Sequence, residues 1–194
     1  MRFLWWPLLL SVALCFFNIY AGSVAGEKYS NTVLIPSVET ETFTHNFYHV
    51  CKNVVFIVAS GCTGVLLVFI GRKPLLIVGQ ALMSISLLSL YTVEYADWNT
   101  KLGMASVTTF LIGFNVGTAT ILWIYMSDTL NDTGVMVAAF SIWVFFGGQL
   151  RGVPWAAVDT WNYATLFMIL FVVSLVGITF FIVFVYETKG KTQT

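Results

Sequence analysis

Charged side chains are scarce in this sequence of 194 residues, since Asp, Glu, Lys and Arg together make up only 9%. A typical soluble domain carries about 25% charged residues, so the composition excludes an ordinary soluble protein. The nine basic and nine acidic residues give a formal net charge of zero. Proteins that bind nucleic acid depend on an excess of positive charge, so we exclude nucleic acid as a partner.

Residue types that carry metal or nucleophilic chemistry are also few. His45 and His49 lie four residues apart, with Glu41 one turn earlier, but the third strong ligand that a zinc site requires is missing. The sequence contains no nucleophile elbow, phosphate-binding glycine loop or metalloprotease pattern. We therefore expect no metal site, no cofactor and no enzymatic activity. The cysteines show no CxxC spacing and are expected to be small packing residues; they are Cys15, Cys51 and Cys62.

Long apolar segments dominate the remainder of the sequence. Hydrophobic residues make up 58%, and the mean hydropathy is +0.86. A membrane-spanning helix needs about 20 mostly apolar residues, and mostly short polar links join the segments. We therefore predict an all-α integral membrane protein, with one bundle over residues 1–194. Its spans are expected at about residues 3–21, 47–70, 75–93, 102–126, 135–150 and 163–185.

The first of these segments allows a second interpretation. Arg2 gives it a basic start, and Ser23-Val24-Ala25 resembles the cleavage site of a signal peptide. We interpret the segment as a retained membrane helix.

Basic residues near the ends of the spans predict the orientation of the chain, since cytoplasmic loops carry an excess of Lys and Arg. One side would carry five basic and three acidic residues, and the other four basic and six acidic residues. We therefore predict a multi-pass protein with both termini on the cytoplasmic or matrix side. The sequence does not determine whether this membrane is an organelle inner membrane or the plasma membrane.

Four amide side chains lie inside the predicted spans, where a polar group is expected to face the bundle interior or a cavity. They are candidates for solute contact, but amides also hold helices together with about 0.6–2 kcal/mol each. Gly113 and Gly117 form a GxxxG pattern, which lets a neighbouring helix approach closely. The four amides belong to Asn18, Gln80, Asn115 and Gln149.

Two short motifs follow the second and sixth predicted spans. Residues Gly71 to Gly79 read GRKPLLIVG, and residues Tyr186 to Thr192 read YETKGKT. They resemble the GR(R/K)PLL and PETKG(R/K)T motifs that sugar porters of the major facilitator superfamily carry after their eighth and twelfth helices. Trp123, followed five residues later by Asp128, resembles W-x4-E at the end of the tenth helix. In order and spacing, nearly the whole chain resembles the C-terminal six-helix half of a sugar porter.

The resemblance implies a role for the charges at these helix ends. In sugar porters such charges pair across helix ends and hold the outward-facing state, and a few pairs can shift a two-state equilibrium. The same charges would also anchor the spans and set the topology, so both roles are open. The corresponding cluster comprises Arg72, Lys73, Asp128, Glu187 and Lys189.

The residues that recognise the sugar in this family have few counterparts here. The seventh helix of sugar porters carries QQ.SG.N followed by paired tyrosines, whose amides and hydroxyls bind sugar hydroxyls. With Asn18 aligned to the Asn of this pattern, Val12 and Ala13 replace the two glutamines. Gly22 and Ser23 replace the tyrosines. Because a buried polyol requires matched donors and acceptors, the likeness implies ancestry more strongly than sugar binding.

A full sugar porter binds its solute between two six-helix halves, and this chain supplies one. Our main hypothesis is therefore a repurposed half-porter that acts as a non-catalytic structural subunit of a larger membrane complex. The alternative is a half-size facilitator of a hexose or another small solute, working as a dimer or with a separate N-terminal half. The expected partners are membrane lipids and either other integral membrane subunits or a second six-helix half, with a sugar under the alternative.

Overall fold

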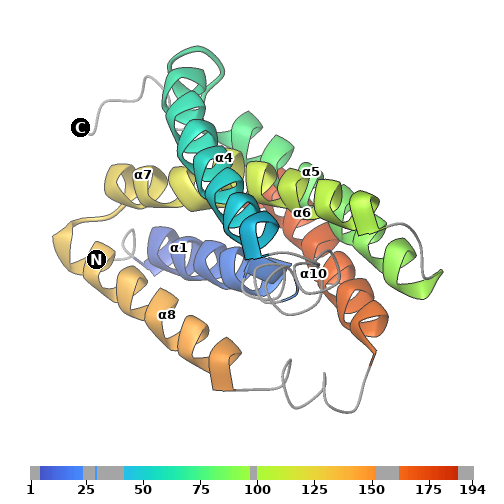
Figure 1. Cartoon of the computed structure of the whole chain (residues 1–194). Coiled ribbons are helices and arrows are strands. Elements are labelled where there is room, and N and C mark those ends of the chain that lie inside the picture. Colours follow the sequence, from blue (N-terminus) through green and yellow to red (C-terminus); the bar gives the residue numbers. More distant parts are fainter. Residues whose placement is uncertain (1–4, 24–28, 30–41, 97–99, 152–161, 188–194) are drawn as a thin grey trace.

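The computed structural model describes residues 5–23, 29, 42–96, 100–151 and 162–187, and the side chains of these residues except 23, 42–49, 100 and 148–151. The described chain is built from helices that form one bundle, so the predicted all-α membrane fold is confirmed (Figure 1). The elements are α1 (Trp5–Asn18), η1 (Ile19–Ser23), α4 (Thr42–Phe69), α5 (Arg72–Tyr95), α6 (Thr100–Phe114), η3 (Asn115–Ala119), α7 (Thr120–Thr129), α8 (Asp132–Arg151) and α10 (Tyr163–Phe184).

These elements correspond to the six predicted spans. Five of these six spans are long and apolar enough to cross a bilayer. The remaining one, α8, has a shorter apolar part at Asp132–Gly147. The helix that contains the span expected at about residues 47–70 begins earlier, at Thr42. A helix of 28 residues is about 42 Å long, whereas the hydrocarbon core is about 30 Å thick. The polar start of α4 can therefore remain helical outside the hydrocarbon region.

Two spans are not continuous α-helices, which the sequence did not predict. α1 passes into the segment η1, where the chain is kinked at Gly22 with a φ of +103°, and a π-helical segment, η3, separates α6 from α7. A π turn contains one extra residue and releases a backbone carbonyl from its usual partner. In η3 the carbonyl of Asn115 accepts a hydrogen bond from the Thr120 hydroxyl at 3.0 Å.

The central helix of the bundle is α5, which packs against α10 and against α6 and η3. Three glycines allow it to cross the fourth span at very short distance. A Cβ atom added to Gly79 would lie 2.3 Å from Gly117 Cα, and one added to Gly113 would lie 2.9 Å from the Gly79 carbonyl oxygen. Such close approach gives the van der Waals contact that holds helices together in lipid. The GxxxG pattern therefore serves packing within the bundle.

The helices α4 and α8 are the least covered elements. In the most apolar part of α4 only 11% of the residues are buried, against 50% in α5. Ile57 of α4 is 69% exposed and Trp143 of α8 is 79% exposed. Cys15 is buried, as expected for a packing residue, but Cys51 and Cys62 are exposed. The expectation is wrong for these two because they lie on α4.

Replacing Gly79 with Ala tests the close helix crossing. The added methyl group would meet the backbone of Gly117, so we expect the free energy of unfolding to fall by about 1–3 kcal/mol. The matched control is Gly64→Ala on α4, where an added Cβ meets nothing within 4 Å. That variant should be unchanged or more stable by about 0.5–1 kcal/mol. Thermal unfolding in detergent measures both, and equal effects would contradict the packing role of Gly79.

Candidate functional site

An ion pair connects the start of α5 to the end of α7. The Arg72 guanidinium nitrogen Nη2 lies 2.7 Å from Asp128 Oδ2, and the two side chains are 23% and 30% exposed. The sequence places both residues at span ends, and the helix crossing brings those ends together. At this partial burial the pair is screened less than a surface pair would be.

Glu187, which follows α10, binds the backbone at the N-terminus of α5. Its Oε1 and Oε2 accept hydrogen bonds from the N–H groups of Arg72 and Lys73 at 3.2 and 3.1 Å. A helix N-terminus has unpaired N–H groups and partial positive charge, which favours a carboxylate there. Gly71 permits the approach, because it adopts a φ of +93° and an added Cβ would lie 3.0 Å from Glu187 Oε2.

Lys73 adds a further link between α5 and α10. Its Nζ donates a hydrogen bond to the Ile182 carbonyl oxygen at 2.8 Å, in the last turn of α10. The structure thus brings together four of the five residues in the predicted charge cluster. The fifth, Lys189, lies outside the described residues. The geometry joins the ends of three spans, and the gating role of the cluster stays a prediction.

Asn115 connects the π segment η3 to α4. Its Oδ1 accepts a hydrogen bond from the Ser60 hydroxyl at 3.0 Å, and its Nδ2 donates to the Leu111 carbonyl oxygen at 2.8 Å. Its backbone carbonyl also accepts from the Thr63 hydroxyl at 3.4 Å. Only 1% of Asn115 is exposed, so this amide joins helices in the described conformation.

A second buried polar group joins α5 to α10. Gln80 Nε2 donates to Ser174 Oγ at 2.8 Å, Ser174 and Ser84 share a bond of 2.7 Å, and Ser84 Oγ donates to the Gln80 carbonyl at 2.9 Å. Because Ser84 uses its only proton for the carbonyl, Ser174 must donate to Ser84. Gln80 Oε1 is buried without a hydrogen-bond partner, which carries a cost for a group inside a bundle.

The described amides proposed for solute contact are buried, and two of them bond to different helices. Asn115 faces α4 and Gln80 faces α10, and Asn18 is 6% exposed. Gln149 lies in α8, but its side chain is outside the described residues, as are those of His45 and His49. The hydroxyl partners could not be singled out from the sequence, because serine and threonine are common throughout the spans. These partners are Ser60, Thr63, Ser84 and Ser174.

Tyr29 is another residue that the sequence did not single out, since it lies in the long polar stretch before α4. It is 2% exposed, and its hydroxyl donates to Glu94 Oε2 at 2.6 Å. Its ring packs edge-on against Tyr163 and Phe167, with centroid distances of 5.2 and 4.9 Å. Burial and the bond to Glu94 raise the pKa of Tyr29 above its ordinary value. Tyr29 thereby contacts the end of α5 and the start of α10.

Replacing Glu187 with Gln tests the contact with the start of α5. The variant keeps the size of the side chain but loses the negative charge, so we expect the free energy of unfolding to fall by about 1–2 kcal/mol. Amide exchange at residues 72 and 73 should become faster. Asp132→Asn, which changes a charge in the first turn of α8, is the control and should affect neither amide. Unchanged exchange in Glu187→Gln would refute the contact.

Two substitutions in the Gln80 group should differ in their effects. Gln80→Leu removes an unpaired buried oxygen together with one donor, so stability should change by less than about 1 kcal/mol. Ser174→Ala leaves the Gln80 amide without its acceptor and should cost about 1–3 kcal/mol. Thermal unfolding in detergent compares them. A larger loss for Gln80→Leu than for Ser174→Ala would contradict the interpretation that Gln80 contributes mainly through its bond to Ser174.

Comparisons with known proteins relate this arrangement to a family of carriers. Facilitated trehalose transporter Tret1 of Culex quinquefasciatus is 29% identical over 203 residues, and Tret1 of Polypedilum vanderplanki is 30% identical over 202. Each match covers 96% of this chain and 38% of the relative. A double tryptophan mutant of XylE has a TM-score of 0.88 at 20% identity, covering 98% of this chain and 42% of that structure.

The crystal structure of a D-xylose-proton symporter is 20% identical and has a TM-score of 0.78, and the match covers 96% of this chain and 44% of that one. These structural matches show a shared fold, and the chain spans less than half the length of its relatives. The sequence profile of the family described as "Sugar (and other) transporter" matches residues 2–194. This chain is therefore an integral, multi-pass membrane protein that belongs to the sugar transporter family, with the fold of a major facilitator half.

Proposed function

We propose that this chain forms the C-terminal half of a facilitated carrier for a small sugar, and that a second six-helix bundle completes it. The observation that carries the proposal is the family match over residues 2–194. It agrees with the motif order, in which GRKPLLIVG follows the second span and YETKGKT follows the sixth. The comparisons favour this alternative over an accessory subunit, for which they offer no support.

The outward sides of α4 and α8 are the proposed contact surface for the second bundle. They expose large apolar side chains, among them Ile57 and Val65 on α4 at 69% and 61%, and Phe140 and Trp143 on α8 at 70% and 79%. In a two-half carrier the solute binds where the halves face each other near the midplane. A second bundle against this surface would therefore enclose the solute path.

Facilitation rather than proton coupling fits the composition of this half. None of the six predicted spans contains an Asp or Glu residue. Carboxylates inside the membrane are typical of proton relays in transporters. Two of the relatives are named facilitated trehalose transporters, which supports a neutral sugar as the solute of this chain.

Trp123 is the proposed solute-facing residue of α7. The described amides are almost fully buried, whereas Trp123 is 49% exposed, although Leu122 and Tyr125 of the same helix are buried. Small-molecule sites combine aromatic side chains with a few polar groups, and a sugar ring presents an apolar face that suits an indole. Trp123 also corresponds to the tryptophan of the W-x4-E motif in the family, with Asp128 at the position of the Glu.

Uptake of radiolabelled trehalose and of a hexose into proteoliposomes tests the proposed function. The assembly containing this chain is extracted gently from its native membrane and reconstituted, with empty liposomes and L-glucose as controls. We expect saturable uptake that persists without a proton gradient. Trp123→Ala should lower kcat/KM by about tenfold, equivalent to about 1.4 kcal/mol, while the exposed Trp5→Ala leaves it unchanged.

Two outcomes would count against the proposal. If uptake never exceeds that of empty liposomes while the assembly remains intact, the accessory-subunit hypothesis replaces the carrier. If uptake is saturable but requires a proton gradient, facilitation is wrong while sugar transport stands. Equal losses in Trp123→Ala and Trp5→Ala would remove Trp123 from the solute path.

A further inference from the structure

One side-chain hydrogen bond in the fourth span reaches back further along its helix than the others. The Thr120 hydroxyl donates to the Asn115 carbonyl oxygen at 3.0 Å, five residues earlier in the chain. The other described serine and threonine hydroxyls that bond to a carbonyl of their own helix reach back three or four residues. Three or four is the spacing on a regular α-helix, whereas five is the spacing of a π turn. The Thr120 bond therefore favours the π turn of η3 over a regular one.

Helix α4 binds the residue at which the π turn begins. Thr63 of α4 is fully buried and donates at 3.4 Å to the Asn115 carbonyl oxygen, which also accepts from Thr120. Ser60 of α4 donates to Asn115 Oδ1 at 3.0 Å. Both the backbone and the side chain of Asn115 are therefore held by α4, and the turn that follows determines the orientation of the rest of the span.

Helix α7 follows the π turn directly and has one buried and one exposed side. Leu122 and Met126 are buried, whereas Trp123 is 49% exposed, and Asp128 is paired with Arg72. If η3 relaxed to a regular α-helix, α7 would turn about its axis by one residue position relative to the start of the turn. Trp123 would then leave its present position, and Asp128 would turn away from Arg72.

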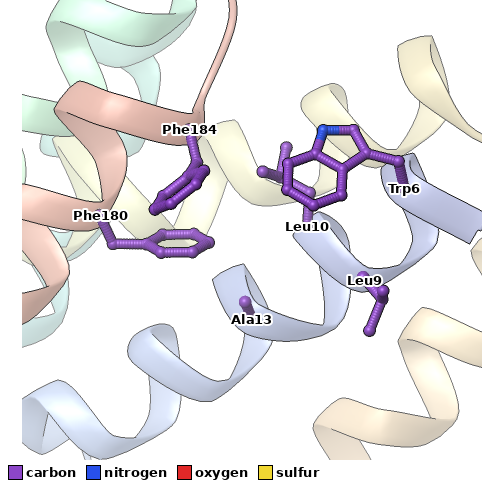
Figure 2. Close-up of a pocket in the computed structure, with 6 residues that line it drawn as sticks. All are labelled: Trp6, Leu9, Leu10, Ala13, Phe180 and Phe184. Atoms are coloured by element: carbon purple, nitrogen blue, oxygen red, sulfur yellow. The ribbon is translucent and has the colours of Figure 1, made fainter.

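An apolar groove between the start of α1 and the end of α10 offers no alternative place for a sugar (Figure 2). Its lining residues are Trp6, Leu9, Leu10, Ala13, Phe180 and Phe184. Five of the six have purely hydrocarbon side chains, and the sixth contributes an indole. The hydroxyls of a sugar would find almost no hydrogen-bond partners there. Solute contact is therefore better sought on α7, and the orientation of α7 bears directly on it.

We propose that Thr120 is a positioning residue of the carrier. Its hydroxyl maintains the π turn by bonding to the Asn115 carbonyl, and the turn holds Trp123 toward the solute and Asp128 toward Arg72. Thr120 acts through the orientation of α7 rather than by contact with the solute. The part that concerns the solute rests on the proposed function, whereas the orientation of α7 can be tested without transport.

Thr120→Val tests the proposal, because valine keeps the shape of threonine and lacks the hydroxyl. Leu122→Cys on the buried side of α7 and Trp123→Cys on the exposed side report its orientation through their rates of maleimide labelling. Each is introduced into a chain in which the exposed Cys51 and Cys62 are replaced by Ser. With Thr120 present, position 123 should label about tenfold faster than position 122, because labelling requires an accessible thiol. Thr120→Val should reduce this difference several-fold.

The uptake assay supplies a second measurement. Thr120→Val should lower kcat/KM about fivefold, the effect of losing one neutral hydrogen bond, and mainly through KM. In a Trp123→Ala background the same change should have little further effect, because Thr120 then has no solute contact to position. Thr120→Ser restores the hydroxyl and should restore both the labelling difference and kcat/KM. Thr129→Val is the matched control, since it removes a hydroxyl bond of 2.7 Å to the Tyr125 carbonyl of the same helix, and it should change neither.

The proposal is overturned if Thr120→Val leaves the labelling difference unchanged, if Thr129→Val reduces it equally, or if Thr120→Ser fails to restore it. Additive losses of uptake in the variant that combines Thr120→Val with Trp123→Ala would overturn the part that concerns the solute. If the unaltered protein shows no uptake, the carrier proposal fails, and the labelling alone decides whether Thr120 orients α7. Circular dichroism and size-exclusion chromatography verify folding, and Thr120→Ala replaces Thr120→Val if that variant does not fold.

Discussion

The contact between Gly79 of α5 and Gly117 of η3 determines where the other helices of this bundle can lie. Helices in lipid gain little from apolar burial, so close backbone packing supplies much of the attraction between them. With α5 held against the fourth span, its first residue, Arg72, comes within reach of Asp128 at the end of that span. The same placement leaves Gln80 facing α10, where Ser174 accepts its hydrogen bond.

The bundle has one strongly connected side and one weakly connected side. α5 and α10 share the Gln80–Ser174 bond, and the Glu187 carboxylate joins the end of α10 to the start of α5. By contrast, α4 is attached mainly through Asn115 of η3, and most of its apolar surface is exposed. In the proposed carrier, the less covered side would be the one that meets the second bundle.

Much of the fold followed from the sequence, because spans of about 20 apolar residues leave few alternatives in a membrane. The charge cluster was also predictable, since its residues belong to short motifs at span ends, although the bond from Glu187 to the backbone of α5 was not. The hydrogen bonds between spans could not be predicted from the sequence. A serine such as Ser60 or Ser174 gives no indication in the sequence of whether it faces lipid or an amide. The π segment η3 was missed because its sequence, NVGTA, is equally compatible with a regular α-helix.

The π segment has a consequence for every residue that follows it in the fourth span. One extra residue in a turn rotates the rest of a helix by about 100° around its axis. Asn115 faces Ser60 before this rotation, and Asp128 faces Arg72 after it. On a regular helix the same sequence would turn Asp128 and Trp123 toward other neighbours. A helical wheel drawn for the uninterrupted span would therefore assign both side chains to the wrong face.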